Sequence, residues 1–201
     1  MNKNGTLILA ASGTGKTTAA TLFENVVDLD SIDFAFLYDK SLYGELPAEQ
    51  LKNVINGWLA NPGRYAKDSI RWNPACPKNY IDAISSQLNK GKIVLVPFIQ
   101  KVFDLAVQHF GDTDIRKIIL FPPADNFNEY QQRYHHRGND ENFINIRRNE
   151  FSSLAKLFET AQGFEKIVIS QGKYLSDFLM GFFTSRKTSH NPPLHHRLRH
   201  S

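Results

Sequence analysis

The chain has 201 residues, of which 41% are hydrophobic and 22% charged, as expected for one globular domain. A single cysteine, Cys76, excludes an intramolecular disulfide framework and a cysteine-rich zinc site. The formal net charge of +4 could suggest a nucleic-acid partner. However, four of the 24 basic groups follow residue 185, and these four account for the whole excess over the 20 acidic groups. These four are Arg186, Lys187, Arg197 and Arg199. We therefore expect a neutral body that does not bind nucleic acid tightly.

Short apolar runs alternate with helical patterns along the chain, which is typical of α/β folds with a parallel sheet. The predicted strands cover residues 6–10, 25–28, 92–97, 116–121 and 165–170. The predicted helices cover residues 16–24, 48–59, 79–89, 100–110, 126–137, 140–161 and 174–183. No apolar run is long enough to cross a membrane, and no signal-peptide pattern precedes the first strand. We expect a cytoplasmic protein.

The organisation that this pattern predicts is one domain over residues 1–183 with two specialised segments. Residues 31–77 are polar, aromatic and interrupted by prolines, and they are predicted to form an insert. Residues 125–148 are polar and rich in arginine, as a lid would be. Residues 184–201 lack periodicity and contain Pro192-Pro193, so we predict a disordered basic tail.

The strongest motif is AASGTGKT at residues 10–17, between the first predicted strand and the first predicted helix. Gly13 and Gly15 allow the backbone to turn its N–H groups toward an anion, and the helix N-terminus adds its dipole. Lys16 would reach the terminal phosphates of a nucleoside triphosphate, and the Thr17 hydroxyl would bind Mg²⁺. The segment therefore predicts a P-loop that binds ATP or another nucleoside triphosphate. The predicted binding residues are Ser12, Gly13, Thr14, Gly15, Lys16, Thr17 and Thr18.

Two acids follow the second predicted strand in the sequence VVDLDS. If the chain stays extended, Asp28 and Asp30 point the same way. We assign Asp28 to Mg²⁺, and Asp30 to the acceptor as a base or ligand. Alternatively, both are solvated acids at a strand end. The later strands end in Pro97-Phe98 and in Pro122-Pro123, without the acid that many ATPases and motor proteins need.

With these residues in place, the sequence resembles the nucleoside-monophosphate-kinase and shikimate-kinase branch of P-loop proteins. The resemblance rests on residues 10–17, on Asp28-x-Asp30 and on the late arginine-rich segment, and its element order spans residues 5–183. The pattern is also similar to small bacteriophage-encoded nucleotide-kinase-like proteins. The family implies a three-layer P-loop NTPase fold with about five parallel strands flanked by helices, a substrate-binding insert after the second strand, and a mobile lid.

Two groups of arginines are candidates for binding charge. Arg133 and Arg137 are four residues apart, so they share a helix face and could stabilise the transferred phosphoryl group from a lid. Arg147 and Arg148 could reach the same phosphates. In the insert, Arg64 and Arg71 accompany several aromatic residues and could bind an acceptor. Alternatively, the lid arginines are solvated, and the insert aromatics form a small core.

The favoured function is ATP-dependent transfer of the γ-phosphoryl group to a small acceptor, and the favoured acceptor is a nucleotide or nucleoside. A sugar acid or shikimate-like hydroxyl is a variant of this reading. The alternatives are a P-loop ATPase or nucleotide-binding module that acts on DNA or protein, and a module that binds nucleotide without turnover. The acceptor, the donor base and the oligomeric state are left open by the sequence.

Overall fold

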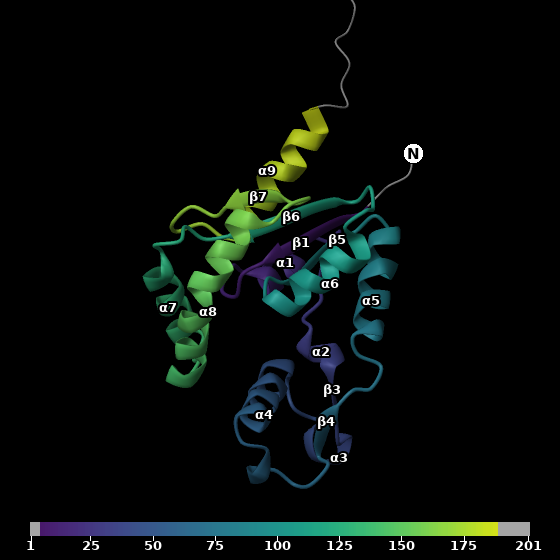
Figure 1. Cartoon of the computed structure of the whole chain (residues 1–201), viewed down its shortest axis with the longest axis vertical. Helices are drawn as coiled ribbons and strands as arrows, with labels where there is room; N and C mark the ends of the chain where they lie inside the picture. Colours follow the sequence, from purple (N-terminus) through teal and green to yellow (C-terminus); the bar gives the residue numbers. More distant parts are fainter. Residues whose placement is uncertain (1–4, 189–201) are drawn as a thin grey trace, which may run out of the picture.

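The computed structural model describes residues 5–188 and has a parallel sheet at its centre (Figure 1). The five strands lie in the order β2-β5-β1-β6-β7, and every neighbouring pair is parallel. The strands are β1 (Thr6–Ala10), β2 (Val26–Asp28), β5 (Ile93–Pro97), β6 (Arg116–Phe121) and β7 (Glu165–Val168). The predicted five-stranded parallel sheet is confirmed.

The two faces of the sheet are covered by different helices. One face packs against α5 (Lys78–Asn89), α6 (Gln100–Phe110) and α8 (Glu141–Thr160). The other face packs against α1 (Lys16–Leu22) and α9 (Leu175–Thr188). The result is the three-layer α/β P-loop fold expected from the alternating pattern.

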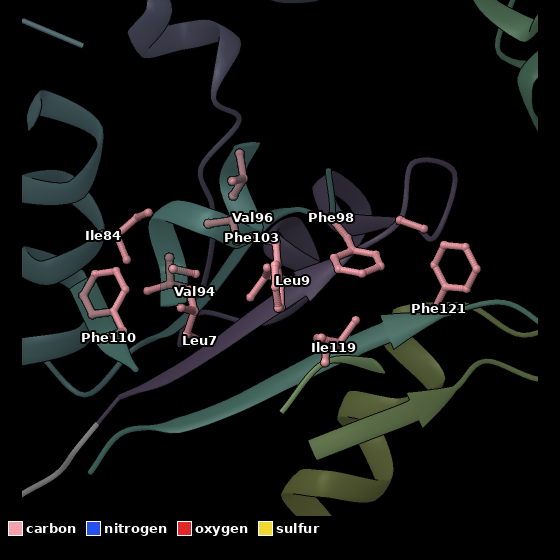
Figure 2. Close-up of a cluster of buried hydrophobic side chains, with 14 of the residues drawn as sticks. Leu7, Leu9, Ile84, Val94, Val96, Phe98, Phe103, Phe110, Ile119 and Phe121 are labelled. Atoms are coloured by element: carbon pink, nitrogen blue, oxygen red, sulfur yellow. The ribbon is translucent and has the colours of Figure 1, made fainter. Parts of the chain in front are cut away.

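Alternation along each strand explains this layering. Leu7 and Leu9 face the first set of helices, whereas Ile8 and Ala10 face the second. Figure 2 shows the first cluster, in which Leu9 and Ile119 from neighbouring strands lie beside Phe98 and Phe121. Because the central strands are buried on both faces, they read as unbroken apolar runs.

The insert at residues 31–77 is more regular than expected. Helix α4 (Ala48–Ala60) was predicted, but the segment also holds α2 (Ile32–Ala35), α3 (Lys40–Tyr43) and the 3₁₀ turn η1 (Pro62–Arg64). Strands β3 (Phe36–Tyr38) and β4 (Ile70–Trp72) form a two-stranded antiparallel sheet. In Figure 1 these elements form a lobe below the main sheet. A small apolar core around Phe36, Ile55 and Ile70 holds the lobe together.

The segment predicted to be a lid contains a helical hairpin, formed by α7 (Phe127–His136) and the first turns of α8. The chain reverses at Gly138, whose φ of 76° is left-handed, and Asp140 then caps α8 by accepting a hydrogen bond from Phe143 N at 2.8 Å. Figure 1 shows this hairpin beside the sheet, on the same side as the insert lobe.

At the C-terminal end, α9 continues to Thr188. Residues 184–188, predicted as the start of a disordered tail, are therefore helical. The remainder of the predicted tail, residues 189–201, lies outside the described residues. Between residues 5 and 188, no helix combines the length and the apolar character needed to cross a membrane.

Candidate active site

The P-loop lies at the carboxyl edge of the sheet, where β1 ends. Gly13 and Gly15 have φ values of 80° and 88°, so both adopt the left-handed conformation that glycine tolerates. The buried Thr14 does not point outward: its hydroxyl donates to Ala11 O at 2.8 Å and closes the loop on itself. Its own carbonyl accepts from Leu175 N at 2.9 Å, which ties the loop to the start of α9.

Helix α7 supports the P-loop from the outside. Tyr134 Oη donates to Ser12 O at 3.1 Å, and Arg133 Nη1 donates to Gly13 O at 3.0 Å. A methyl group on Gly13 would lie 3.0 Å from Tyr134 Cε1 and 3.1 Å from Tyr130 Cδ1. Burial raises the pKa of Tyr130 to about 12, so its hydroxyl stays protonated beside the loop. The loop conformation is thus held by glycine and by a close-packed aromatic support.

Lys16 opens α1 and bends back over the loop. Its Nζ lies 3.3 Å from Ala10 O and 3.5 Å from Ala11 O. Burial lowers the pKa of the Lys16 ammonium, and the nearby carboxylates of Asp28 and Asp30 partly offset that effect. A cation in this position can bind the terminal phosphates of a nucleotide whose other phosphates occupy the loop.

Thr17 and Asp28 form a site that fits Mg²⁺. The Thr17 hydroxyl donates to Asp28 Oδ2 at 2.8 Å, so the two predicted metal ligands are neighbours. Asp28 Oδ1 is buried and has no hydrogen-bond partner among the described residues. Hydroxyl and carboxylate oxygens suit Mg²⁺, which takes few protein ligands and completes its shell with water and phosphate. Residues 5–188 contain no group of three or more acidic, histidine or cysteine side chains that could hold a metal ion.

Asp30 follows the end of β2 and contacts the insert. Its Oδ2 accepts from Lys52 Nζ of α4 at 3.0 Å, and its Oδ1 accepts from Ile32 N at 3.2 Å. The side chains of Lys52 and Asp30 are 22% and 29% exposed, so this ion pair is sheltered. The sequence did not point to Lys52.

The two arginines proposed for the lid have different environments. Arg133 is buried and donates to Gly13 O, to Lys173 O and to the carboxylate of Glu129. Its guanidinium lies 4.0 Å from the ring centre of Tyr174. Arg133 therefore acts as a structural tie between α7, the P-loop and the loop before α9, and it also lines the cleft together with Arg137. Arg137 lies just beyond the end of α7, is exposed and lines the cleft.

These groups surround one cleft of about 860 Å³. The P-loop wall contributes every predicted phosphate-binding residue except Thr14, and the acids Asp28 and Asp30 lie beside it. The hairpin wall contributes Arg133, Arg137 and Arg147, among others. The insert wall includes Ser31, Ile32 and a face of α4 with Lys52, Asn53, Asn56 and Leu59. Arg148 is not part of the lining and instead donates to Gln131 and Asn145.

The predicted acceptor residues of the insert lie elsewhere. Arg64 is in η1 and Arg71 is in β4; both are exposed, and neither lines this cleft. Several insert aromatics, among them Trp58 and Tyr65, pack against the core of the lobe, as the alternative interpretation expects, whereas Trp72 is exposed. The side chains that do face the P-loop, Asn53 and Asn56, could have been found from their spacing on the predicted 48–59 helix, where residues three and four apart share a face.

A phosphate-binding loop between the first strand and the first helix of a parallel sheet defines the class: this is a P-loop α/β protein. No family model matches the chain, and no curated protein matches it. Among solved structures it is similar to a gluconokinase from Sinorhizobium meliloti 1021, with 13% identity over 95% of this chain and 100% of that chain and a TM-score of 0.41. It is also similar to guanylate kinase from Anaplasma phagocytophilum, with 11% identity over 94% of this chain and 88% of that chain and a TM-score of 0.39. At such low identities and TM-scores, neither similarity assigns a substrate to this chain.

Proposed function

We propose that this chain is a P-loop kinase that transfers the γ-phosphoryl group of ATP, or of another nucleoside triphosphate, to a small acceptor, a nucleotide or nucleoside. The observation that carries the proposal is the shared cleft: Lys16, Asp30 and Arg137 line it together. A cleft of about 860 Å³ is at the upper end of the range for small-molecule sites, which suits two substrates side by side.

The donor phosphates would lie on the backbone N–H groups of the P-loop with Lys16 at the terminal phosphate. Mg²⁺ held by Thr17 and Asp28 would neutralise charge on the donor phosphates. Arg137 faces the same space from the hairpin, where a fixed cation can stabilise charge that develops on the transferred group. The residues thus supply positioning and electrostatic stabilisation, which are the main requirements of phosphoryl transfer.

The acceptor would lie between Asp30 and the polar face of α4. Its oxygen forms a bond to the γ-phosphorus while the bond from that phosphorus to the bridging oxygen breaks, and the nucleoside diphosphate leaves. Where the acceptor oxygen is a hydroxyl, its proton passes to the Asp30 carboxylate. Asn53 and Asn56 offer carboxamides, which donate and accept hydrogen bonds and so can recognise a base edge or sugar hydroxyls.

The test is a screen of acceptors with ATP and Mg²⁺, followed by phosphorus NMR and mass spectrometry. Nucleosides, nucleoside monophosphates, sugars and sugar acids are offered separately, with Lys16→Ala as the inactive control. A phosphorylated nucleotide or nucleoside product supports the proposal. A phosphorylated sugar acid would support kinase activity but would contradict the proposed acceptor class. Hydrolysis of ATP without transfer, especially if DNA stimulates it, would instead support the hypothesis of a P-loop ATPase.

A further inference from the structure

The ion pair between Lys52 and Asp30 connects the insert with the candidate base. Lys52 belongs to α4, and Asp30 follows β2 of the main sheet, yet their charged atoms lie 3.0 Å apart at the cleft. A surface ion pair contributes little to stability on average. A sheltered pair at the point where two lobes meet is better suited to fixing geometry.

The carboxylate of Asp30 is held at both oxygens. The Ile32 N–H binds Oδ1 and the Lys52 ammonium binds Oδ2, which together fix the plane of the group. A carboxylate has about four lone-pair positions, so two such contacts leave capacity for a hydrogen bond from an acceptor hydroxyl. The pair therefore orients Asp30 without using up its ability to accept.

The same contact seats α4 over the cleft. The base of the insert is attached independently, because Asn73 and Asn79 each donate to Phe34 O at 3.0 Å, and Tyr80 Oη donates to Leu29 O at 3.0 Å. Lys52 lies one helical turn before Asn56, so its position also sets the position of the polar face.

We propose that Lys52 is a positioning residue for phosphoryl transfer, which orients Asp30 toward the acceptor and holds the polar face of α4 at the working distance from the P-loop. This inference rests on the proposed function. It assigns Lys52 no contact with the transferred group, so its loss should affect turnover through Asp30 and should leave donor binding intact.

The experiment compares Lys52→Met, Lys52→Arg, Asp30→Asn and the Lys52→Met/Asp30→Asn double variant. Lys101→Met, at an exposed position on α6, is the matched control. Because misplacement of about 1 Å can cost roughly 100-fold in rate, we expect Lys52→Met to lower kcat by about 10- to 100-fold. The ATP dissociation constant should change less than about twofold, and Lys52→Arg should restore most of the rate.

The double variant separates positioning from a general loss of structure. If Lys52 acts through Asp30, then adding Lys52→Met to Asp30→Asn should cost little further rate. Hydrogen exchange of the α4 amides supplies a second readout that needs no acceptor, and it should be faster in Lys52→Met than in Lys101→Met. Additive losses of rate, or unchanged exchange in α4, would overturn the inference. Absence of transfer by the unmodified chain would contradict the proposed function, and the exchange result would still decide whether Lys52 seats α4.

Discussion

The Thr17 hydroxyl donates a 2.8 Å hydrogen bond to Asp28 Oδ2, which joins the first turn of α1 to the end of β2. The sheet creates this relationship. Asp28 is in register with Leu95 on β5, and Ala10, which precedes the P-loop, is in register with Pro97 on the other side of the same strand. Parallel strands end at a common edge, so the loop after β1 and the acids after β2 meet there.

Replacement of Asp28 by Asn should make the reaction depend on higher Mg²⁺ concentrations. The substitution preserves the size of the side chain and allows the hydrogen bond from Thr17, but it removes the charge that would hold the ion. We expect kcat at low millimolar Mg²⁺ to fall by about 100-fold, comparable to other losses of transition-state charge stabilisation. Titration of the transfer rate with Mg²⁺ measures the effect. Thr21→Val, one turn further along α1, is the control and should leave the Mg²⁺ titration unchanged. An equal dependence on Mg²⁺ in Asp28→Asn and the unmodified chain would remove Asp28 from the metal site.

Donor binding should weaken at alkaline pH because of Lys16. Burial lowers the pKa of its ammonium, so the side chain loses its proton at lower pH than a solvent-exposed lysine does. The charged form is the one that attracts phosphates; affinity is therefore complete below the lowered pKa and falls as pH rises through it. The ATP dissociation constant, measured by calorimetry from pH 7 upward, should increase before the range near pH 10.4 that is typical of free lysine. In Lys16→Met, affinity should be low throughout and should lack this dependence on pH. A flat profile in the unmodified chain would contradict the role assigned to Lys16.

Replacement of Arg133 should mainly lower stability, whereas replacement of Arg137 should mainly lower the rate of transfer. Arg133 is 9% exposed and bonded to Glu129, whose side chain is 16% exposed, so Arg133→Met leaves a sheltered carboxylate without its cation. Breaking a buried ion pair on one side costs about 3 to 5 kcal/mol, and we expect a loss of that size in the free energy of unfolding. Arg137→Ala, at an exposed position, should change the free energy of unfolding by less than about 0.5 kcal/mol and lower kcat by about 100-fold. Urea unfolding and steady-state kinetics on both variants test the assignment. If Arg133→Met is stable but no longer transfers phosphoryl groups, Arg133 acts in catalysis and not as a structural tie.

The pH dependence of stability provides an independent check on this tie. Burial alone raises the pKa of Glu129, but hydrogen bonds from Asn126, Gly172 and Arg133 outweigh it and hold the pKa below its ordinary value. A carboxyl whose pKa is lower in the folded chain stabilises the fold above its ordinary pKa, and this contribution disappears as pH falls through the lowered one. The fall in stability from pH 6 toward pH 3 should therefore be smaller in Glu129→Gln than in the unmodified chain. An identical fall in both proteins would show that Glu129 does not contribute to acid sensitivity.

The sequence predicts the sheet and the P-loop well because both depend on local signals. Apolar runs mark the strands, and the glycines, Lys16 and Thr17 occur at fixed spacing between a strand and a helix. The pairing of β3 with β4 was not predictable, because two strands of three residues each meet across more than thirty residues of chain. The inward turn of Arg133 was missed for a similar reason. Its acceptor, Gly13 O, lies 120 residues away along the sequence, so the helical pattern around Arg133 gives no indication of this hydrogen bond.

The location of the acceptor site can be tested by comparing two parts of the insert. Asn56 lines the cleft, whereas Arg64 and Arg71 are exposed outside it. One hydrogen bond contributes about 0.5 to 1.5 kcal/mol, so Asn56→Ala should raise the acceptor KM by about 3- to 10-fold with little change in the KM for ATP. Arg64→Ala and Arg71→Ala should leave both KM values within about twofold, since neither side chain faces the P-loop. The three variants are matched in position within the insert, and urea unfolding checks that all remain folded. A large increase in the acceptor KM in the arginine variants, with Asn56→Ala unaffected, would mean that the acceptor binds on the β3–β4 side of the lobe and that the insert must rotate to bring it to Lys16.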